Sequence, residues 1–245
     1  MAQDEFPSNV PITQILYVDI PASSDLGNTS LEPGRAWAKL LDLIACSPGF
    51  VRLYWGRRLE EVKKVQLHIV FSRLTELPYT RIVKNTLAQH HDFISSSEYI
   101  HETLPLLKSL GVPGSSIPIR HMSLRHQVLA NPFSKTLLGY PIGTAIYKSC
   151  NAAWHEGSWP LWTHVVRHVS GCLGIAGGQV LEPVEGMAGS YCVFVGWQTA
   201  KHHDDYHHTD HFRKHSVILK IGHEGWTEYG HVVFMGYREN AAGRL

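Results

Sequence analysis

The same order of strand-like and helix-like segments occurs twice in this chain, and the repetition constrains the fold more than any single motif. In the first half, an alternating segment at residues 12–20 precedes an amphipathic segment at 35–45. Two strand-like segments joined by a charged turn come next, followed by two helix-like segments and a last alternating segment. These five lie at residues 51–57, 65–72, 79–96, 98–110 and 117–128. The first half therefore predicts the order β-α-β-β-α-β.

The second half predicts the same order. It begins with a strand at residues 143–149 and a helix at 159–172, which the glycines between 171 and 178 are expected to end. The remaining segments are strands at 179–184 and 190–197, a helix at 201–215 and a strand at 226–237. We expect an α+β protein made of two tandem ferredoxin-like units. The first unit is assigned to residues 1–130 and the second to residues 131–245.

Composition argues against several classes of protein. Of the 245 residues, 44% are hydrophobic and 18% are charged, as in a folded globular protein. The net charge is +1 and no basic stripe is present, so we expect no nucleic-acid partner. No window approaches the roughly 18 apolar residues of a membrane span, and no apolar stretch follows the acidic N-terminus. We therefore expect a cytoplasmic protein with no membrane partner.

A histidine-rich segment at residues 201–215 is the strongest pointer to function, because it holds six of the 17 histidines. Histidine titrates close to neutral pH, so such a group can supply proton-transfer agents or metal ligands. Pairs such as His203/His207 and His207/His211 have the spacing that places two imidazoles on one helical face. The glutamate of the H-E-x-x-H motif is missing, however, and such spacings arise easily among clustered histidines. No metal site is predicted.

Motifs of the second half resemble one known superfamily. The strand Tyr191-Cys-Val-Phe-Val-Gly-Trp197 runs into the histidine-rich segment, which contains Thr209-Asp-His-Phe212. This pattern resembles the dimeric α+β barrels, in particular antibiotic-biosynthesis-monooxygenase-like and stress-responsive domains. The resemblance implies that the two units pair into an intramolecular barrel, as in a tandem version of fungal type. It also implies a ligand pocket between the sheet and the helices of each half.

The resemblance extends to a possible acid–base motif. Polyketide-type cyclases of the superfamily carry an H-x-x-H on the second helix, and His208-Thr-Asp-His211 is similar to it. His211 is then the implied general base and His208 its companion. The cyclases also have a tyrosine six residues before the base, whereas this chain has Asp205 there and Tyr206 one position later. That departure weakens the assignment of the cyclase reaction itself.

Strand alternation suggests residues that bind substrate. Tyr229 and His231 share one face of the last strand, and Tyr147 on the first strand of the second half is expected to face the same cavity. Trp197 ends a strand where the superfamily commonly has an aromatic residue. No dinucleotide, phosphate-loop, flavin or haem motif is present, so we predict no cofactor.

Three functions remain open at this point. The first is an enzyme of secondary metabolism that uses histidine acid–base catalysis to cyclise, isomerise or rearrange a small apolar polyketide or aromatic intermediate. The second is a cofactor-independent monooxygenase that begins with the same deprotonation. The third is a non-catalytic ligand-binding or stress protein. In each case the partner is a small hydrophobic molecule. The sequence also allows two tandem chains to form a homodimer.

Overall fold

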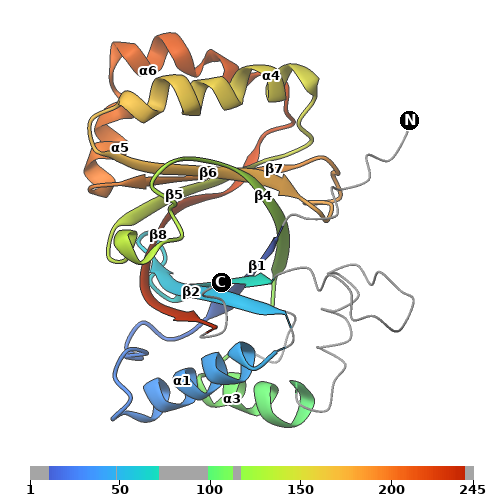
Figure 1. Cartoon of the computed structure of the whole chain (residues 1–245), viewed down its shortest axis with the longest axis vertical. Helices are drawn as coiled ribbons and strands as arrows, with labels where there is room; N and C mark the ends of the chain where they lie inside the picture. The colour runs from blue at the N-terminus through green and yellow to red at the C-terminus, as the bar shows by residue number, and fades with distance from the viewer. Residues whose placement is uncertain (1–10, 48, 72–98, 113–116, 241–245) are drawn as a thin grey trace.

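Eight antiparallel strands close into one barrel in the computed structural model, which describes residues 11–47, 49–71, 99–112 and 117–240 (Figure 1). The strands follow one another around the barrel in the order β1-β3-β2-β8-β5-β7-β6-β4. The first half supplies β1 (Ile12–Asp19), β2 (Phe50–Arg58), β3 (Lys64–Phe71) and β4 (Ile119–Leu129). The second half supplies β5 (Pro141–Tyr147), β6 (Cys172–Val180), β7 (Tyr191–Trp197) and β8 (Trp226–Glu239).

The two halves are joined strand to strand. β2 of the first half pairs with β8 of the second, and β4 of the first half pairs with β6 of the second. Closure gives each of these eight strands a neighbour on both sides, so none of them is an edge strand. The predicted α+β class with ferredoxin-like architecture is confirmed. The boundary between residues 130 and 131 lies between β4 and β5 and stays a prediction.

The helices lie outside the barrel in two groups on opposite sides (Figure 1). α1 (Glu32–Ala45) and α3 (Leu104–Ser109) belong to the first half. α4 (Ala152–Pro160), α5 (Ala200–His207) and α6 (Asp210–His215) cover the second half. Short helical turns occupy Tyr99–Thr103, Lys135–Leu137, Leu161–Val165, Val166–His168 and Ser216–Lys220. The predicted helix at 79–96 lies outside the described residues.

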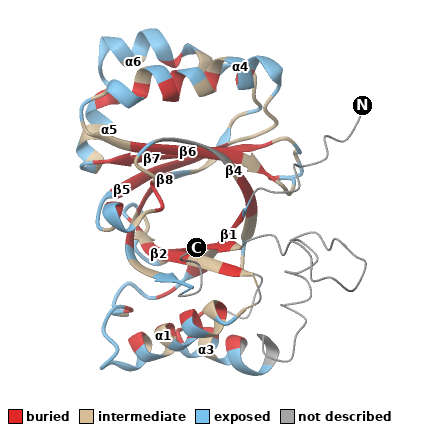
Figure 2. Cartoon of the chain, in the orientation of Figure 1, coloured by how far each residue is buried: buried red, intermediate tan, exposed pale blue. Residues whose placement is uncertain are grey.

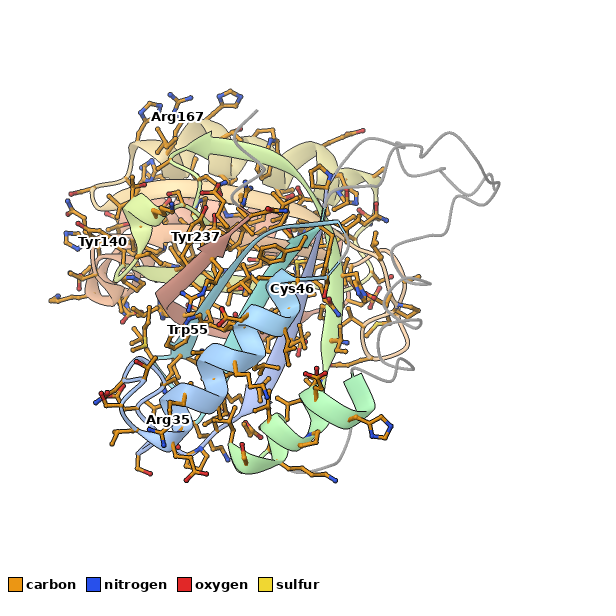
Figure 3. All side chains as sticks on the ribbon, turned by 60° about the horizontal axis from the view of Figure 1, so that its bottom comes forward. Arg35, Cys46, Trp55, Tyr140, Arg167 and Tyr237 are labelled. Atoms are coloured by element: carbon orange, nitrogen blue, oxygen red, sulfur yellow. The ribbon has the colours of Figure 1, made fainter. Side chains whose placement is uncertain are left out.

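Apolar side chains fill the contact between α1 and the sheet. Trp37, Leu40, Leu41 and Ile44 recur at helical spacing and are buried. The Trp37 ring packs edge-on against Trp55 of β2, with 5.5 Å between ring centroids. Figure 3 shows α1 from the outside, with Arg35 and Cys46 near its two ends. This side of the first half is therefore an ordinary hydrophobic core.

The barrel interior is a second apolar core, and buried residues concentrate on the strands (Figure 2). His68 lies fully buried in it, in contact with the rings of Phe133 and Phe234. Its Nε2 lies 3.0 Å from Oε1 of Gln66, and burial lowers the pKa of His68 to about 3. The residue is a neutral, hydrogen-bonded core histidine.

The glycine-rich segment of the second half was assigned wrongly from sequence. A helix was expected at 159–172 and a strand at 179–184, whereas α4 begins at Ala152 and β6 spans Cys172–Val180. The Asn151 side chain accepts the Trp154 backbone N–H and so caps α4. Gly174 and Gly178 lie within β6, where a Cβ would overlap carbonyl oxygens of Ala130 and Ser123. These glycines allow close strand packing and do not end a helix.

The histidine-rich segment is two helices, not the one that was expected. α5 ends at His207 and α6 begins at Asp210. The Thr209 side chain accepts the backbone N–H of Phe212 at 3.0 Å, which makes Thr209 the N-cap of α6. The chain changes direction at this cap. Helical spacing therefore cannot place His207, His211 and His215 on one face.

The β4–β6 contact gives a prediction about stability. Gly178→Ala is expected to lower the free energy of unfolding by about 1–3 kcal/mol, because the new Cβ would force the two strands apart. Gly27→Ala is the matched control, since its Cβ would lie at an ordinary 3.6 Å from Asp25 Oδ1. Urea unfolding followed by circular dichroism measures both variants. A Gly178→Ala variant as stable as the wild type would contradict this strand pairing.

Candidate active site

A narrow cavity lies between the sheet and the helices of the second half. Outward-facing residues of β5, β7 and β8 form its floor, among them Ala145 and Val193. Residues of α5, α6 and the turn after α4, such as Phe212 and Trp162, lie over it. Its volume is about 70 Å³, and its walls are mostly apolar. Any polar group inside is therefore held in a poorly hydrated space.

His203 of α5 lines this cavity. The Thr199 side chain caps α5 by accepting the His202 backbone N–H at 3.2 Å, which fixes the start of the helix. The His203 ring stacks on Trp197, with 4.8 Å between centroids and 17° between planes. A Cβ at Gly143 would come within 3.1 Å of the ring. The glycine on β5 thus leaves room for the imidazole.

A chain of hydrogen bonds runs from His203 to a carboxylate. Nδ1 of His203 lies 2.7 Å from Nε2 of His231, and Nδ1 of His231 lies 2.6 Å from Oε1 of Glu60. An ionised carboxylate can only accept hydrogen bonds, so His231 carries its proton on Nδ1, which faces Glu60. The Nε2 atom of His231 then accepts a hydrogen bond from the Nδ1–H group of His203. This assignment leaves Nε2 of His203 as the basic nitrogen of that ring.

Glu60 reaches this chain from the other half of the protein. It lies in the turn between β2 and β3, and its carboxylate also accepts the His231 backbone N–H, at 2.9 Å for Oε2. The preceding residue, Leu59, donates its backbone N–H to the His231 carbonyl at 3.0 Å. The side chain of Glu60 is 43% exposed, whereas that of His231 is 5% exposed. The site is therefore assembled from both halves.

The surroundings of His203, His207 and Glu60 set the charge of each side chain. Burial, followed by the His207 and His231 imidazoles, lowers the pKa of His203 to about 3. Burial also lowers the pKa of His207, which lines the same cavity. Partial burial raises the pKa of Glu60, but hydrogen bonds from His231 outweigh it and hold that pKa below its usual value. At neutral pH the chain thus consists of neutral His203 and an ionised Glu60.

Hydrogen-bond donors line the same cavity as the neutral imidazole. Trp197 lines the cavity, and its buried Nε1 has no hydrogen-bond partner among the residues that the structure describes. Burial raises the pKa of Tyr147 well above its ordinary value, so its phenol keeps its proton. Burial, with the charges of Asp204 and Glu60, also raises the pKa of Tyr229. The cavity can therefore offer N–H and O–H groups to a substrate oxygen.

The structure brings together some of the residues singled out from sequence. Tyr147, Trp197 and Tyr229 all line the cavity, as does Tyr206. His231 does not line it and lies behind His203 instead. The substrate-binding position inferred for His231 from strand parity is thus a supporting position.

His208 and His211 lie elsewhere. Both are exposed, so the expectation that they occupy the inner side of one helix is wrong. The cause is the break at Thr209, which ends α5 before His211. His211 Nδ1 lies 3.3 Å from the Tyr206 hydroxyl, on the outer side of the helices. His208 follows α5 directly and lines neither this outer region nor the cavity.

Sequence reasoning missed His203, His207 and Glu60 as members of the site. For the two histidines the missed signal was the Thr209-Asp210 pair, which marks the start of a new helix. With α5 ended there, His203 and His207 lie one turn apart on its inner face. Glu60 gave a weaker signal, because its partner His231 is 171 residues away.

The Glu60–His231 contact occurs a second time in the barrel. Leu181 donates its backbone N–H to the His121 carbonyl at 2.9 Å, and the next residue, Glu182, accepts the His121 backbone N–H at 2.9 Å. The Glu182 carboxylate also contacts Nδ1 of His121. Leu59-Glu60 and Leu181-Glu182 thus hold equivalent positions, and each half supplies a glutamate to a histidine of the other half.

The described residues contain neither a candidate metal-binding cluster nor a helix that could cross a membrane. Within these ranges no group of three or more His, Cys, Asp or Glu side chains is arranged to hold a metal ion. Nor does any helix in the described part of the chain have the length and apolar character needed to cross a membrane.

No protein-family model and no curated protein matches the sequence. Solved structures do match the fold. An anthrone oxidase-like protein has a TM-score of 0.65 at 10% identity, over 99% of this chain and 97% of that protein. A candidate monooxygenase from Lactobacillus acidophilus has a TM-score of 0.54 at 11% identity, over 94% and 96%. A candidate chlorite dismutase has a TM-score of 0.51 at 13% identity, over 93% and 95%.

These likenesses extend over nearly the whole chain. The chain has the dimeric α+β barrel fold. The barrel explains why the cavity lies where the sequence resemblance implied, between the sheet and the helices of one half. At identities of 10–13% the likeness concerns the fold, and the tandem fungal type stays a prediction.

Proposed function

We propose that this protein is a cofactor-independent enzyme that deprotonates a small aromatic substrate and lets the resulting carbanion react with dioxygen. The observation that carries the proposal is the Glu60–His231–His203 chain, which ends in an apolar cavity. The structural likeness to an anthrone oxidase-like protein and to a candidate monooxygenase supports an oxygen-consuming reaction. An anthrone is the substrate type to test first, because its ketone acidifies the opposite methylene group.

In the proposed reaction Nε2 of His203 accepts the methylene proton. The positive charge that forms on His203 is stabilised through His231 by the Glu60 carboxylate, as a carboxylate stabilises the imidazolium of a catalytic triad. Burial lowers the pKa of His203, and attraction between the new imidazolium and the substrate anion raises it again. Proton removal thus becomes favourable only when substrate is bound.

The negative charge of the carbanion moves onto the ketone oxygen. Trp197 Nε1–H and the Tyr147 hydroxyl are the donors proposed to stabilise that oxygen. Dioxygen then adds to the carbanion and forms a peroxide, which takes the proton back from His203. The O–O bond of this hydroperoxide breaks as the second methylene hydrogen is lost, water leaves, and the methylene carbon becomes a carbonyl carbon. Overall, one anthrone and one dioxygen give one anthraquinone and one water, so one oxygen atom enters the product and the other leaves as water.

Oxygen uptake tests this proposal against the two other functions. Anthrone is incubated with the full chain, and dioxygen consumption and quinone formation are measured together, with the His203→Gln variant correcting for spontaneous oxidation. One dioxygen per quinone above that background is the expected result. Conversion of a substrate without oxygen uptake would favour cyclisation or isomerisation of a polyketide-type intermediate. Binding without conversion would favour a ligand-binding protein. A role in secondary metabolism belongs to the same proposal.

A further inference from the structure

A second and larger hollow adjoins the cavity on the outer side of the helices. This outer groove has a volume of about 430 Å³ and is lined by Val165, Val169, Ser170, Tyr206 and His211, together with His168, His202, Asp205 and Thr209. Tyr206 is the residue that lines both the groove and the inner cavity. One aromatic side chain therefore forms part of the wall between the two spaces.

The sizes of the two spaces set a problem for substrate binding. Pockets that bind small molecules usually measure about 300–1,000 Å³. The inner cavity, at about 70 Å³, holds the proposed base but cannot enclose a polycyclic ring system. The outer groove has the volume but not His203. A substrate of several rings would need both spaces at once.

The Tyr206 side chain is buried, and few polar contacts hold it in place. Its hydroxyl makes one long hydrogen bond, 3.3 Å, to Nδ1 of the exposed His211. Its ring packs edge-on against the partly buried Phe212, with 5.3 Å between centroids. The residue lies one turn before the cap that separates α5 from α6, where the Thr209 hydroxyl donates to the Tyr206 carbonyl at 2.8 Å. Rotation of the ring thus costs one weak hydrogen bond and its packing against Phe212 and Trp197, and leaves the backbone contact intact. A bound aromatic ring can replace that packing.

We propose that the outer groove is the subsite for the remote rings of a polycyclic aromatic substrate, and that Tyr206 is the partition that moves aside to admit them. The inference rests on the proposed function for the identity of the reacting end, which lies at His203. Val165 and Val169 supply apolar contacts for the remote rings. Nδ1 of His202 contacts Thr199 and Nδ1 of His211 contacts Tyr206, so the Nε2 atoms of both rings can hydrogen-bond to phenolic hydroxyl groups. The Asp205 carboxylate is paired with Lys201 at 2.6 Å. The subsite therefore selects hydroxylated aromatic rings.

Blocking the groove without touching the inner cavity tests this subsite. Ser170 is exposed and lines the groove, so Ser170→Trp fills it at little risk to folding. Arg167 is exposed, lies nearby in sequence and does not line the groove, so Arg167→Trp is the matched control. Equilibrium dialysis of the full chain measures the Kd of 1,8-dihydroxyanthraquinone, a three-ring probe that is not turned over, and of phenol, a one-ring probe. Ser170→Trp is expected to raise the Kd of the three-ring probe about 10-fold or more and to leave that of phenol unchanged.

Tyr206→Leu supplies an independent measurement. A smaller side chain opens the partition, so the three-ring probe is expected to associate faster, by a factor of about 3–10. Equal Kd values for the three-ring probe in Ser170→Trp and Arg167→Trp would overturn the subsite, as would a failure of the wild type to bind that probe. Ring-selective binding in a wild type that consumes no oxygen would leave the subsite standing and reject the proposed reaction.

Discussion

His203→Gln is expected to lower kcat for anthrone oxidation by a factor of about 10²–10⁴, the usual contribution of a general base. Glutamine keeps much of the volume of the ring but cannot accept a proton at pH 7. Its amide can still donate to His231 Nε2, so the rest of the hydrogen-bonded chain keeps its contact. The lost interaction, proton transfer to the base, is made only in the transition state. We therefore expect a large fall in kcat and a small change in KM. Initial rates of oxygen uptake at several anthrone concentrations measure both.

His208→Gln is the control, and it also tests the acid–base motif that the sequence resemblance implied. His208 is exposed and lines neither the cavity nor the groove, so its replacement is expected to leave kcat and KM within about a factor of two of the wild type. The sequence resemblance had placed His208 in the acid–base motif. A large loss in His208→Gln together with full activity in His203→Gln would restore that motif and remove His203 from the mechanism.

The pH profile follows from the same chemistry. A histidine base with its ordinary pKa near 6.5 would lose activity as the pH falls through that value. The pKa of His203 is lowered to about 3, so the free enzyme keeps a neutral base well below pH 6.5. We expect kcat/KM to stay level between about pH 5 and pH 8. A decline in kcat/KM centred near pH 6.5 would point to an exposed histidine instead.

Periodicity predicted much of the fold because its signal is local. Alternation in β1 and the helical spacing of Trp37, Leu40 and Ile44 appear within single segments, and their order gave the two ferredoxin-like units. The glycines of β6 were misassigned because glycine ends helices as readily as it relieves crowding in strands. Only the neighbouring β4 backbone shows which of the two applies at Gly174 and Gly178.

The site was harder to predict because its contacts cross the whole chain. Strand parity correctly placed Tyr147 and Tyr229 toward one cavity, since parity is local once a strand is recognised. The choice among six histidines failed because it depended on one helix break at Thr209. The role of Glu60 depended on pairing β2 with β8, a register that no local pattern contains. Burial then set the protonation of His203, and burial is a property of the assembled barrel.

Glu60→Gln is expected to lower kcat about 10–100-fold, the loss seen when the hydrogen-bond partner behind a metal-bound histidine is removed. Glutamine is nearly the same shape and can still accept a hydrogen bond from His231, but it has no negative charge. The imidazolium that forms on His203 then loses its counter-charge. Because Glu60 does not line the cavity, KM should change little. Stability should change little as well, since the side chain is 43% exposed.

Glu61→Gln is the matched control for that change. Glu61 is the next residue in the same turn, has a similar exposure of 40%, and pairs with Arg58 and Lys64 instead of a histidine. The same loss of charge there is expected to leave kcat within about a factor of two of the wild type. Nitrogen-15 NMR of the histidine rings adds a direct measurement, because loss of the carboxylate should raise the share of His231 rings protonated on Nε2. An unchanged His231 tautomer together with an unchanged kcat in Glu60→Gln would show that Glu60 only joins the two halves, and that His203 works without a carboxylate behind it.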